Sequence, residues 1–186
     1  GSLPEDPMAD EKKEPWLNLL ALTTVILAVC ATLSTFKGGG FSTRSVLRQS
    51  QASDQWAFYQ AKSIKGNLYE LEAVRLAREV KGLEGEKGAG PRLEEARKAL
   101  EDAKAKVAKY DTEKGEIKAK AETLEKERDS AMRQGAPFGL AVIFLQIGIL
   151  LSSIAALLKK QPIYWAGLAV GAVGLVCFAN GFFLFF

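Results

Sequence analysis

Three apolar stretches without a single charge, residues 16–36, 138–158 and 163–186, limit the folds open to this chain more than any other feature. Each has the roughly 20 residues that an α-helix needs to cross a bilayer core of about 30 Å. None of them contains Asp, Glu, Lys or Arg. The sequence therefore predicts an all-α membrane protein with three transmembrane helices and the lipid bilayer as its surroundings.

The charge of the chain is concentrated in the segment between the first two stretches, residues 37–137. This segment holds 21 of the 25 basic and 17 of the 22 acidic residues, with both signs interspersed. A groove for nucleic acid needs a stripe of one sign, so no nucleic-acid partner is expected. The sequence indicates a water-exposed helical surface instead.

Residue types that commonly carry chemistry are scarce. The chain has no histidine, the commonest general base and metal ligand. Cys30 and Cys177 both lie inside apolar stretches, where we expect them to pack as small hydrophobes. The carboxylates lie on predicted helical surfaces without a convergent pocket, and the glycine-rich segment 82–91 lacks the pattern of a phosphate loop. We therefore expect no enzyme, no catalytic residue, no metal and no cofactor.

The start of the chain is excluded from the fold prediction. We interpret residues 1–7 as the remnant of an expression tag before a natural start at Met8, and residues 1–15 as a short N-terminal segment. The apolar stretch that follows is too long for the core of a signal peptide and is followed by Lys37 and three glycines. We expect it to remain as a membrane anchor.

A break rich in glycine, residues 82–91, divides the charged segment into two predicted helices of about residues 42–81 and 92–134. Pro91 suits the first turn of the second helix. Both helices would extend roughly 60 Å at 1.5 Å per residue. Matched lengths predict that the second helix folds back along the first as an antiparallel hairpin.

The second helix carries a regular seam in which positions alternate by three and four. Ten of its twelve members are apolar, and such a seam over about five heptads predicts a coiled coil. The seam comprises Leu93, Ala96, Leu100, Ala103, Val107, Tyr110, Lys114, Ile117, Ala121, Leu124, Arg128 and Ala131.

The first helix of the hairpin carries two apolar stripes instead of one. A face this wide predicts two neighbours, of which one is the second helix and the other a second subunit. We therefore expect a homo-oligomer. One stripe comprises Ala57, Ala61, Ile64, Leu68 and Leu71, and the other comprises Tyr69, Ala73, Leu76, Val80 and Leu83.

Two amides stand out within the predicted spans. Gln146 and Asn180 each need a hydrogen-bond partner in lipid, and counting from the tight connection before the third span places them at depths about 6 Å apart. We expect them to bond each other, either within a subunit or between subunits. The third span also carries Gly167, Gly171 and Gly174, a spacing that favours close helix contact.

An unusual polar and aromatic cluster lies early in the hairpin. One interpretation is that its aromatic rings seat the helix against its neighbours while its polar groups hydrogen-bond locally. The other is a recognition patch for a partner protein, a head group or an ion. The candidate patch comprises Asp54, Gln55, Trp56, Tyr59, Gln60 and Lys62.

With Ala61, these residues form a D-Q-W-x-x-Y-Q-A-K sequence after a first span. This pattern resembles the bacterial domain-of-unknown-function 4337 family of membrane proteins. The specific match covers about 20 residues, and the arrangement of one span, charged helices and two closing spans fits along the whole chain. The resemblance brings no established activity, cofactor or catalytic residue. In this sequence the glycines at 38–40 replace the more polar link expected there.

The leading functional hypothesis is a homo-oligomeric scaffold or interaction platform with a coiled-coil hairpin, open to a protein partner. The alternative is a small ion channel with a pore lined by the first spans, where Thr24 and Thr35 would face water. We expect the bacterial inner membrane as the location.

Membrane orientation is predicted from the short loops. Lys12, Lys13, Lys159 and Lys160 favour the cytoplasm for that side and place the hairpin outside it, although basic residues near the other ends of the spans favour the opposite orientation.

Overall fold

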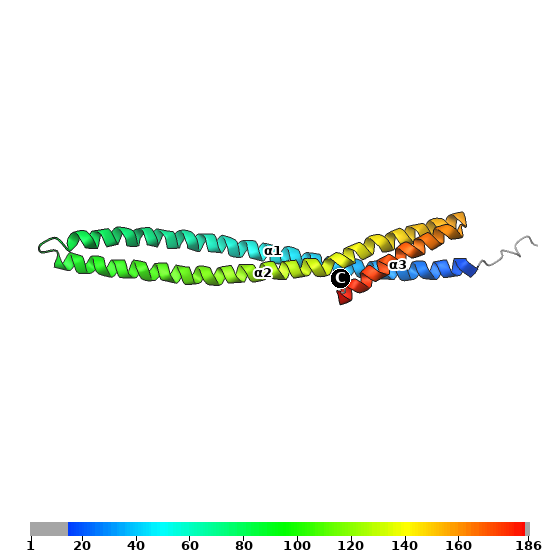
Figure 1. The fold of residues 1–186 in the computed structure, drawn as a ribbon, viewed down its shortest axis with the longest axis horizontal. Coiled ribbons are helices and arrows are strands. Elements are labelled where there is room, and N and C mark those ends of the chain that lie inside the picture. The colour runs from blue at the N-terminus through cyan, green and yellow to red at the C-terminus, as the bar shows by residue number, and fades with distance from the viewer. Residues whose placement is uncertain (1–14, 185–186) are drawn as a thin grey trace, which may run out of the picture. The chain divides into compact units, whose positions relative to one another are not determined.

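The computed structural model describes residues 15–184, which form three helices and no strand: α1 (Pro15–Leu83), α2 (Gly90–Leu158) and α3 (Gln161–Phe183) (Figure 1). The all-helical prediction is confirmed. Contacts divide these residues into a hairpin unit, Ser45–Asp129, and a three-helix unit, residues 15–44 and 130–184. The expectations for residues 1–14, including Lys12 and Lys13, and for residues 185–186 lie outside the described part of the chain.

Helix α1 continues without a break through the glycines at 38–40, where the sequence predicts a boundary between a span and a hairpin helix. Each helical glycine costs about 1 kcal/mol relative to alanine, but Gly38 has a packing role. A Cβ there would lie 3.3 Å from the Cβ of Phe138 on α2, and a Cβ on Gly135 would lie 3.0 Å from the Cβ of Phe41. Close helix approach therefore explains two glycines that local propensity disfavours.

Helix α2 likewise continues through Pro137, the predicted boundary between hairpin and span. Proline lacks the N–H that would bond to the carbonyl four residues earlier and costs about 3 kcal/mol in a helix interior. Pro137 and the following Phe138 are both buried. Their packing offsets part of that cost, and the helix is longer than its local sequence predicts.

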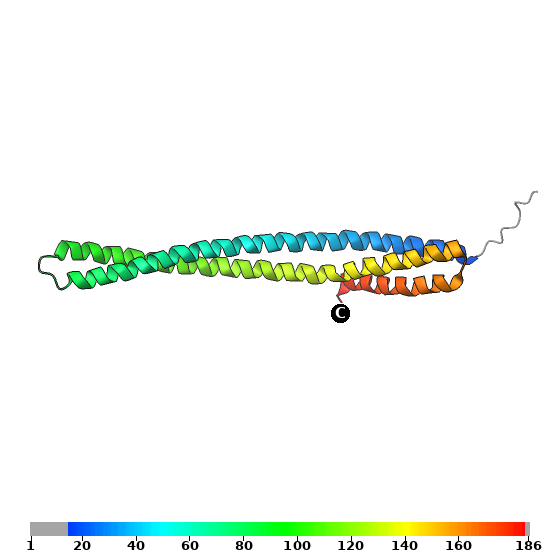
Figure 2. The same ribbon diagram turned by 90° about the horizontal axis from the view of Figure 1, so that it is seen from above.

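The hairpin turn lies where the glycine-rich break predicts it. Helix α1 ends at Leu83 and α2 begins at Gly90, with Gly88 in the left-handed region at φ +90°. The Leu93 N–H bonds to the Ala89 carbonyl at 2.8 Å, and Arg97 pairs with Glu84 at 2.8 Å across the turn. Two segments of the hairpin unit consequently run antiparallel and side by side (Figures 1 and 2).

All twelve residues of the predicted seam on α2 are buried or half-buried. The seam on α1 is equally regular but contains polar residues, so apolar periodicity predicts only its last part. Positions on α1 alternate by four and three, and each is buried or half-buried. They are Arg48, Ala52, Gln55, Tyr59, Lys62, Gly66, Tyr69, Ala73, Leu76, Val80 and Leu83.

The three-helix unit packs α3 against α2 through glycine. A Cβ at Gly174 would lie 2.8 Å from the Leu145 nitrogen, and one at Gly167 would lie 3.1 Å from the Gly148 oxygen. Gly171 makes room for Leu27 of α1, at 2.9 Å. The close contact predicted for these α3 glycines is confirmed.

A tight turn connects α2 to α3. Lys159 adopts the left-handed conformation at φ 51°, and the Lys160 N–H bonds to the Ala155 carbonyl at 3.2 Å. This is the hydrogen bond of a Schellman motif, which satisfies a carbonyl left over at the helix end. Pro162 then lies in the first turn of α3, where its missing N–H costs nothing.

We predict that Gly174→Ala destabilises the three-helix unit by about 1–3 kcal/mol, because the new methyl group overlaps backbone. Gly139→Ala is the matched control, since a Cβ there meets nothing within 4 Å and alanine favours the helix. Thermal unfolding in detergent measures both. Equal behaviour of the two variants would contradict the packing described.

Candidate functional site

The residues of the candidate patch lie on two different faces of α1 in the hairpin unit. Gln55, Trp56, Tyr59 and Lys62 are half-buried toward α2, whereas Asp54 and Gln60 are exposed. The candidate patch is thus not one continuous surface.

The Trp56 indole anchors one side of the helix pair. Its Nε1 donates a hydrogen bond of 2.9 Å to Glu125 Oε1 on α2, and its ring meets Tyr59 edge-on, with centroids 5.6 Å apart. A buried indole N–H normally finds such a partner. This geometry is what the seating interpretation of the aromatic residues predicts.

Lys62 lies in a mixed ionic and aromatic cluster. Its ammonium pairs with Glu113 Oε2 at 2.5 Å and lies 5.3 Å from the centre of the Tyr110 ring. Tyr110 stacks on Tyr69 with centroids 5.7 Å apart, next to the buried Gly66, where a Cβ would make an ordinary contact of 3.5 Å with the Tyr110 Cβ. The last residue of the motif therefore bonds across the hairpin and not locally.

A second ionic layer lies 14 residues away on each helix. Arg48 pairs with Glu127 at 2.7 Å, and Arg128 bonds to both Gln49 and Asp129. The spacing of two heptads explains the two basic residues in the α2 seam, Lys114 and Arg128. Each occupies a seam position where the facing helix also has a basic residue, and acidic neighbours balance the charges.

The ion pair between Lys62 and Glu113 shifts the pKa of both groups. The hydrogen bond from the ammonium lowers the pKa of Glu113 below its ordinary 4.5. The same bond raises the pKa of Lys62 above its ordinary 10.5, against a smaller opposing effect of desolvation. Both groups thus stay charged over the whole neutral range.

A shallow groove of about 490 Å³ borders this cluster. Its chemistry is mixed, with an ion pair, an amide and the exposed Phe58 ring, and no nucleophile with a base lies in it. It is lined by Gln55, Phe58, Lys62, Glu113, Glu116, Ile117 and Lys120.

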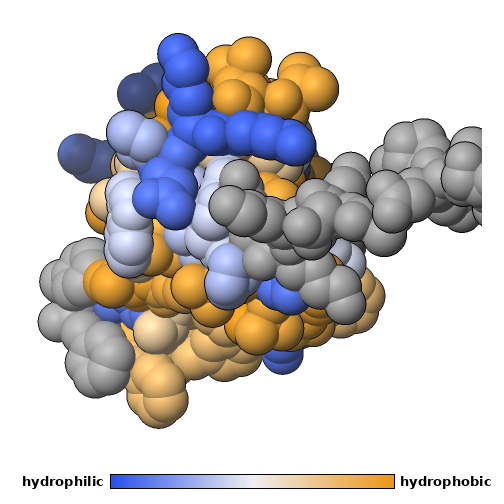
Figure 3. All heavy atoms as spheres, turned by 90° about the vertical axis from the view of Figure 1, so that its right-hand side faces the viewer, coloured by the Kyte–Doolittle hydropathy of each residue, from blue (hydrophilic) through white to orange (hydrophobic). Residues whose placement is uncertain are grey.

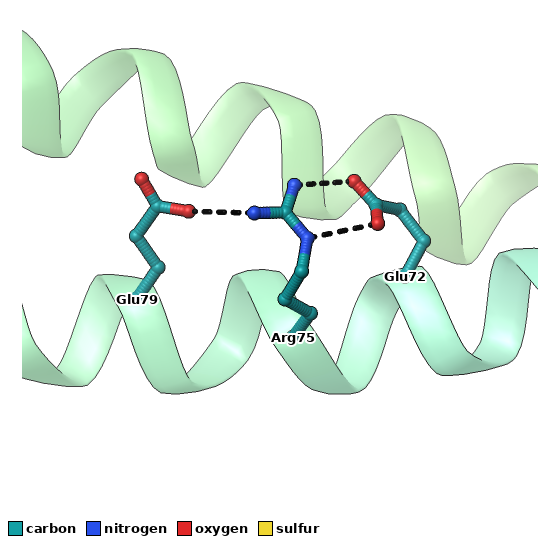
Figure 4. A network of polar contacts seen from close by, with 3 residues as sticks. All are labelled: Glu72, Arg75 and Glu79. Carbon is teal, nitrogen blue, oxygen red and sulfur yellow. Dashed lines mark hydrogen bonds and ion pairs between the residues drawn. The ribbon is translucent and has the colours of Figure 1, made fainter.

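Arg75 forms a network within α1 on the surface of the hairpin unit. Its guanidinium bonds to both carboxylate oxygens of Glu72, at 2.6 and 2.9 Å, and pairs with Glu79 at 3.4 Å (Figure 4). Spacings of three and four residues bring these side chains together on one helix. The network stabilises the helix locally.

The structure does not bring Gln146 and Asn180 together within one subunit. Gln146 is exposed and Asn180 is 3% exposed. The contact of Leu145 with Gly174 sets the register of the antiparallel helices, so Gln146 lies level with Val173. Seven residues, about 10 Å, separate that level from Asn180. A bond between subunits stays a prediction.

The threonines of the proposed pore direct their hydroxyls to their own helix. Thr24 bonds to the Leu20 carbonyl at 2.8 Å and Thr35 to the Ala31 carbonyl at 3.0 Å. Thr24 is half-buried and Thr35 exposed. The channel stays an untested prediction.

An aromatic group marks one end of the three-helix unit. Tyr164 is buried, its hydroxyl lies 3.0 Å from that of Thr23, and its ring is near Trp16 and Trp165. Figure 3 looks onto this end and shows hydrophilic residues gathered beside a larger hydrophobic surface. Trp and Tyr are typical of the level where a membrane meets water.

Within residues 15–184, no group of three His, Cys, Asp or Glu side chains could hold a metal ion. Three helices in the same range are long and apolar enough to cross a membrane.

Fold and site together define an all-helical protein. It has three helices that are long and apolar enough to cross a membrane, and a long antiparallel helix pair. The chain belongs to the family described as domain of unknown function (DUF4337), whose model matches residues 16–184. No curated protein and no solved structure matches the chain.

We predict that Glu113→Gln lowers the melting temperature of the protein at pH 7 by a few degrees, because Lys62 loses its ionic partner. Since the pKa of Glu113 is lower in the folded state, its contribution is complete above pH 4.5 and is lost as the pH falls through the folded value. Variant and wild type should therefore converge in acid.

The contribution of Lys62, whose pKa is raised, is complete below pH 10.5 and disappears as the pH rises through the folded value. Circular dichroism melts across pH measure these effects. Glu116→Gln on the same helix is the control, and a difference from wild type that persists in acid would refute the assignment.

Proposed function

We propose that the protein is a non-enzymatic, homo-oligomeric membrane scaffold, in which the three-helix unit spans the bilayer and the hairpin unit forms a coiled coil in water. The observation that carries the proposal is an apolar stripe on the hairpin unit that no described residue covers. Ile64, Leu68 and Leu71 are 62%, 61% and 68% exposed.

This stripe is directly opposite the seam of α1. Together with the exposed Ala57 and Ala61, its members repeat by four and three, as a second seam does. The matching outward positions of α2 are mostly polar. Between residues 98 and 126 they are Lys98, Asp102, Ala105, Lys109, Thr112, Glu116, Ala119, Thr123 and Lys126.

A second copy of the chain is the simplest occupant of the stripe. Fully burying a Leu or Ile side chain contributes about 1.5–3 kcal/mol, so a pair of stripes supplies several such terms. Anchoring in one bilayer also raises the local concentration of copies. A different protein partner remains an outcome that the test distinguishes.

Membrane insertion is supported by the surface of the three-helix unit. Large apolar side chains point outward along its helices; Leu22, Val25 and Leu150 are between 58% and 59% exposed. Such a surface suits lipid, and the aromatic group around Tyr164 suits an interface. Lys159 and Lys160 in the short turn favour the cytoplasm for that end. We therefore propose the bacterial inner membrane, with the hairpin unit outside the cytoplasm.

Leu68→Asp should convert the oligomer to a monomer while leaving the helical content unchanged, since Leu68 contacts water in the single subunit. Light scattering in detergent measures the mass of the oligomer, and circular dichroism measures the helical content. Ala105→Asp, at an exposed outward position of α2, is the matched control and should keep the wild-type mass. A Leu68→Asp variant with wild-type mass would refute assembly through this stripe.

A further inference from the structure

The charged residues of the three-helix unit all have the same sign. Within residues 15–44 and 130–184 there is no Asp or Glu, whereas Lys37, Arg44, Arg133, Lys159 and Lys160 are present. In the hairpin unit, by contrast, acidic side chains pair with Arg48, Lys62 and many other cations. No described residue of the three-helix unit therefore offers these cations a carboxylate.

Lys37 and Arg44 share one face of α1. They are seven residues apart, which is two turns or about 10 Å, and both side chains are exposed. Among the described residues, neither cation has an ion pair. Two neighbouring cations without a carboxylate suit an anion.

The position of these cations along the spans is given by α3. Leu27 of α1 contacts Gly171, and Thr23 lies beside Tyr164, so the two helices run parallel in a defined register. The last residue of α3, Phe183, is then level with about Gly39. Lys37 lies just inside that level and Arg44 about 7 Å beyond it. Phospholipid phosphates lie in this zone of a bilayer.

A groove of about 570 Å³ adjoins Lys37 on the same helix. Its lining includes Gly39 and Gly40, which add no side chain, and a Cβ on either would meet nothing within 4 Å. Phe36, 78% exposed, forms one wall and Phe41 contributes to the lining. An apolar groove lined by Lys37, with Arg44 two turns further along the same helix, matches a lipid that has an acyl chain and an anionic head group.

We propose that Lys37, Arg44 and the groove at Gly39 and Gly40 form a binding site for an anionic phospholipid. The phosphate contacts the two cations, and the glycerol with the start of an acyl chain lies over the bare helix backbone. A zwitterionic lipid brings its own ammonium group and gains less from the two cations. This site rests on the proposed membrane insertion.

Native mass spectrometry of the full chain in detergent tests the site, with phosphatidylglycerol and phosphatidylcholine as the two probes. The wild-type protein should retain phosphatidylglycerol in preference to phosphatidylcholine. Each cation near an anionic surface contributes about five-fold in affinity, so Lys37→Gln with Arg44→Gln should reduce that preference more than ten-fold. Lys159→Gln with Lys160→Gln removes the same charge at the other end and should keep the preference.

The groove is tested separately by Gly39→Leu with Gly40→Leu, which fills it and keeps both cations. Loss of phosphatidylglycerol adducts is expected, and retention would overturn the role of the groove. The lipid site would be overturned if Lys37→Gln with Arg44→Gln and Lys159→Gln with Lys160→Gln lost the preference for phosphatidylglycerol equally. It would also be overturned if inorganic phosphate at the same concentration displaced the lipid.

Flotation with phosphatidylcholine liposomes separates the two proposals. A protein that floats but lacks any lipid preference overturns this inference alone, while a protein that fails to float overturns membrane insertion and the lipid site together.

Discussion

The alternating seam between α1 and α2 is the constraint on which the rest of the hairpin unit depends. Its register is set by ionic layers, in which Arg48 meets Glu127 and Lys62 meets Glu113. A slip by one heptad would place these charges against apolar layers, and a half-buried charge without its partner is costly. Ionic layers therefore select one register among several that apolar packing alone would allow.

The position of the motif and of the outward stripe both follow from this register. Once Tyr59, Lys62 and Gly66 face α2, the residues half a turn away must face outward. That places Ile64 and Leu68 on the surface of a single subunit. The same helix thus has one face that folds the chain and another available for assembly, and the proposed scaffold uses the second.

The helices of this chain are easier to predict from its sequence than the residues at which they end. The α2 seam and the hairpin turn are visible because apolar periodicity and Gly88 with Pro91 are local signals. The α1 seam was found only in part, because Arg48, Gln55, Lys62 and Gly66 occupy positions where an apolar residue is the usual sign. Continuity of the helices through residues 38–40 and Pro137 could not be predicted either, since tertiary packing overrides local propensity there.

In the candidate site, too, some features follow from the local sequence and others only from the packing of the helices. Aromatic seating of Trp56 and Tyr59 is one of the sequence-based interpretations. The partner of Trp56, Glu125, and that of Lys62, Glu113, can be named only once the register is known. The predicted bond between Gln146 and Asn180 depends on how far apart the two residues lie along the helix axes. The glycine contacts between α2 and α3 set a larger separation than counting from the turn between the helices predicts.

Distance measurement between spin labels most directly tests the claim that α1 pairs with a second copy of itself. In a chain with Cys30→Ala and Cys177→Ala, a label is attached at Lys65→Cys beside the stripe, with Lys109→Cys on the outward face of α2 as the control. Helices in contact lie about 8–10 Å apart, so the account predicts a short distance between subunits for Lys65 and a longer one for Lys109. No coupling between Lys65 labels, or a shorter distance at Lys109, would contradict it.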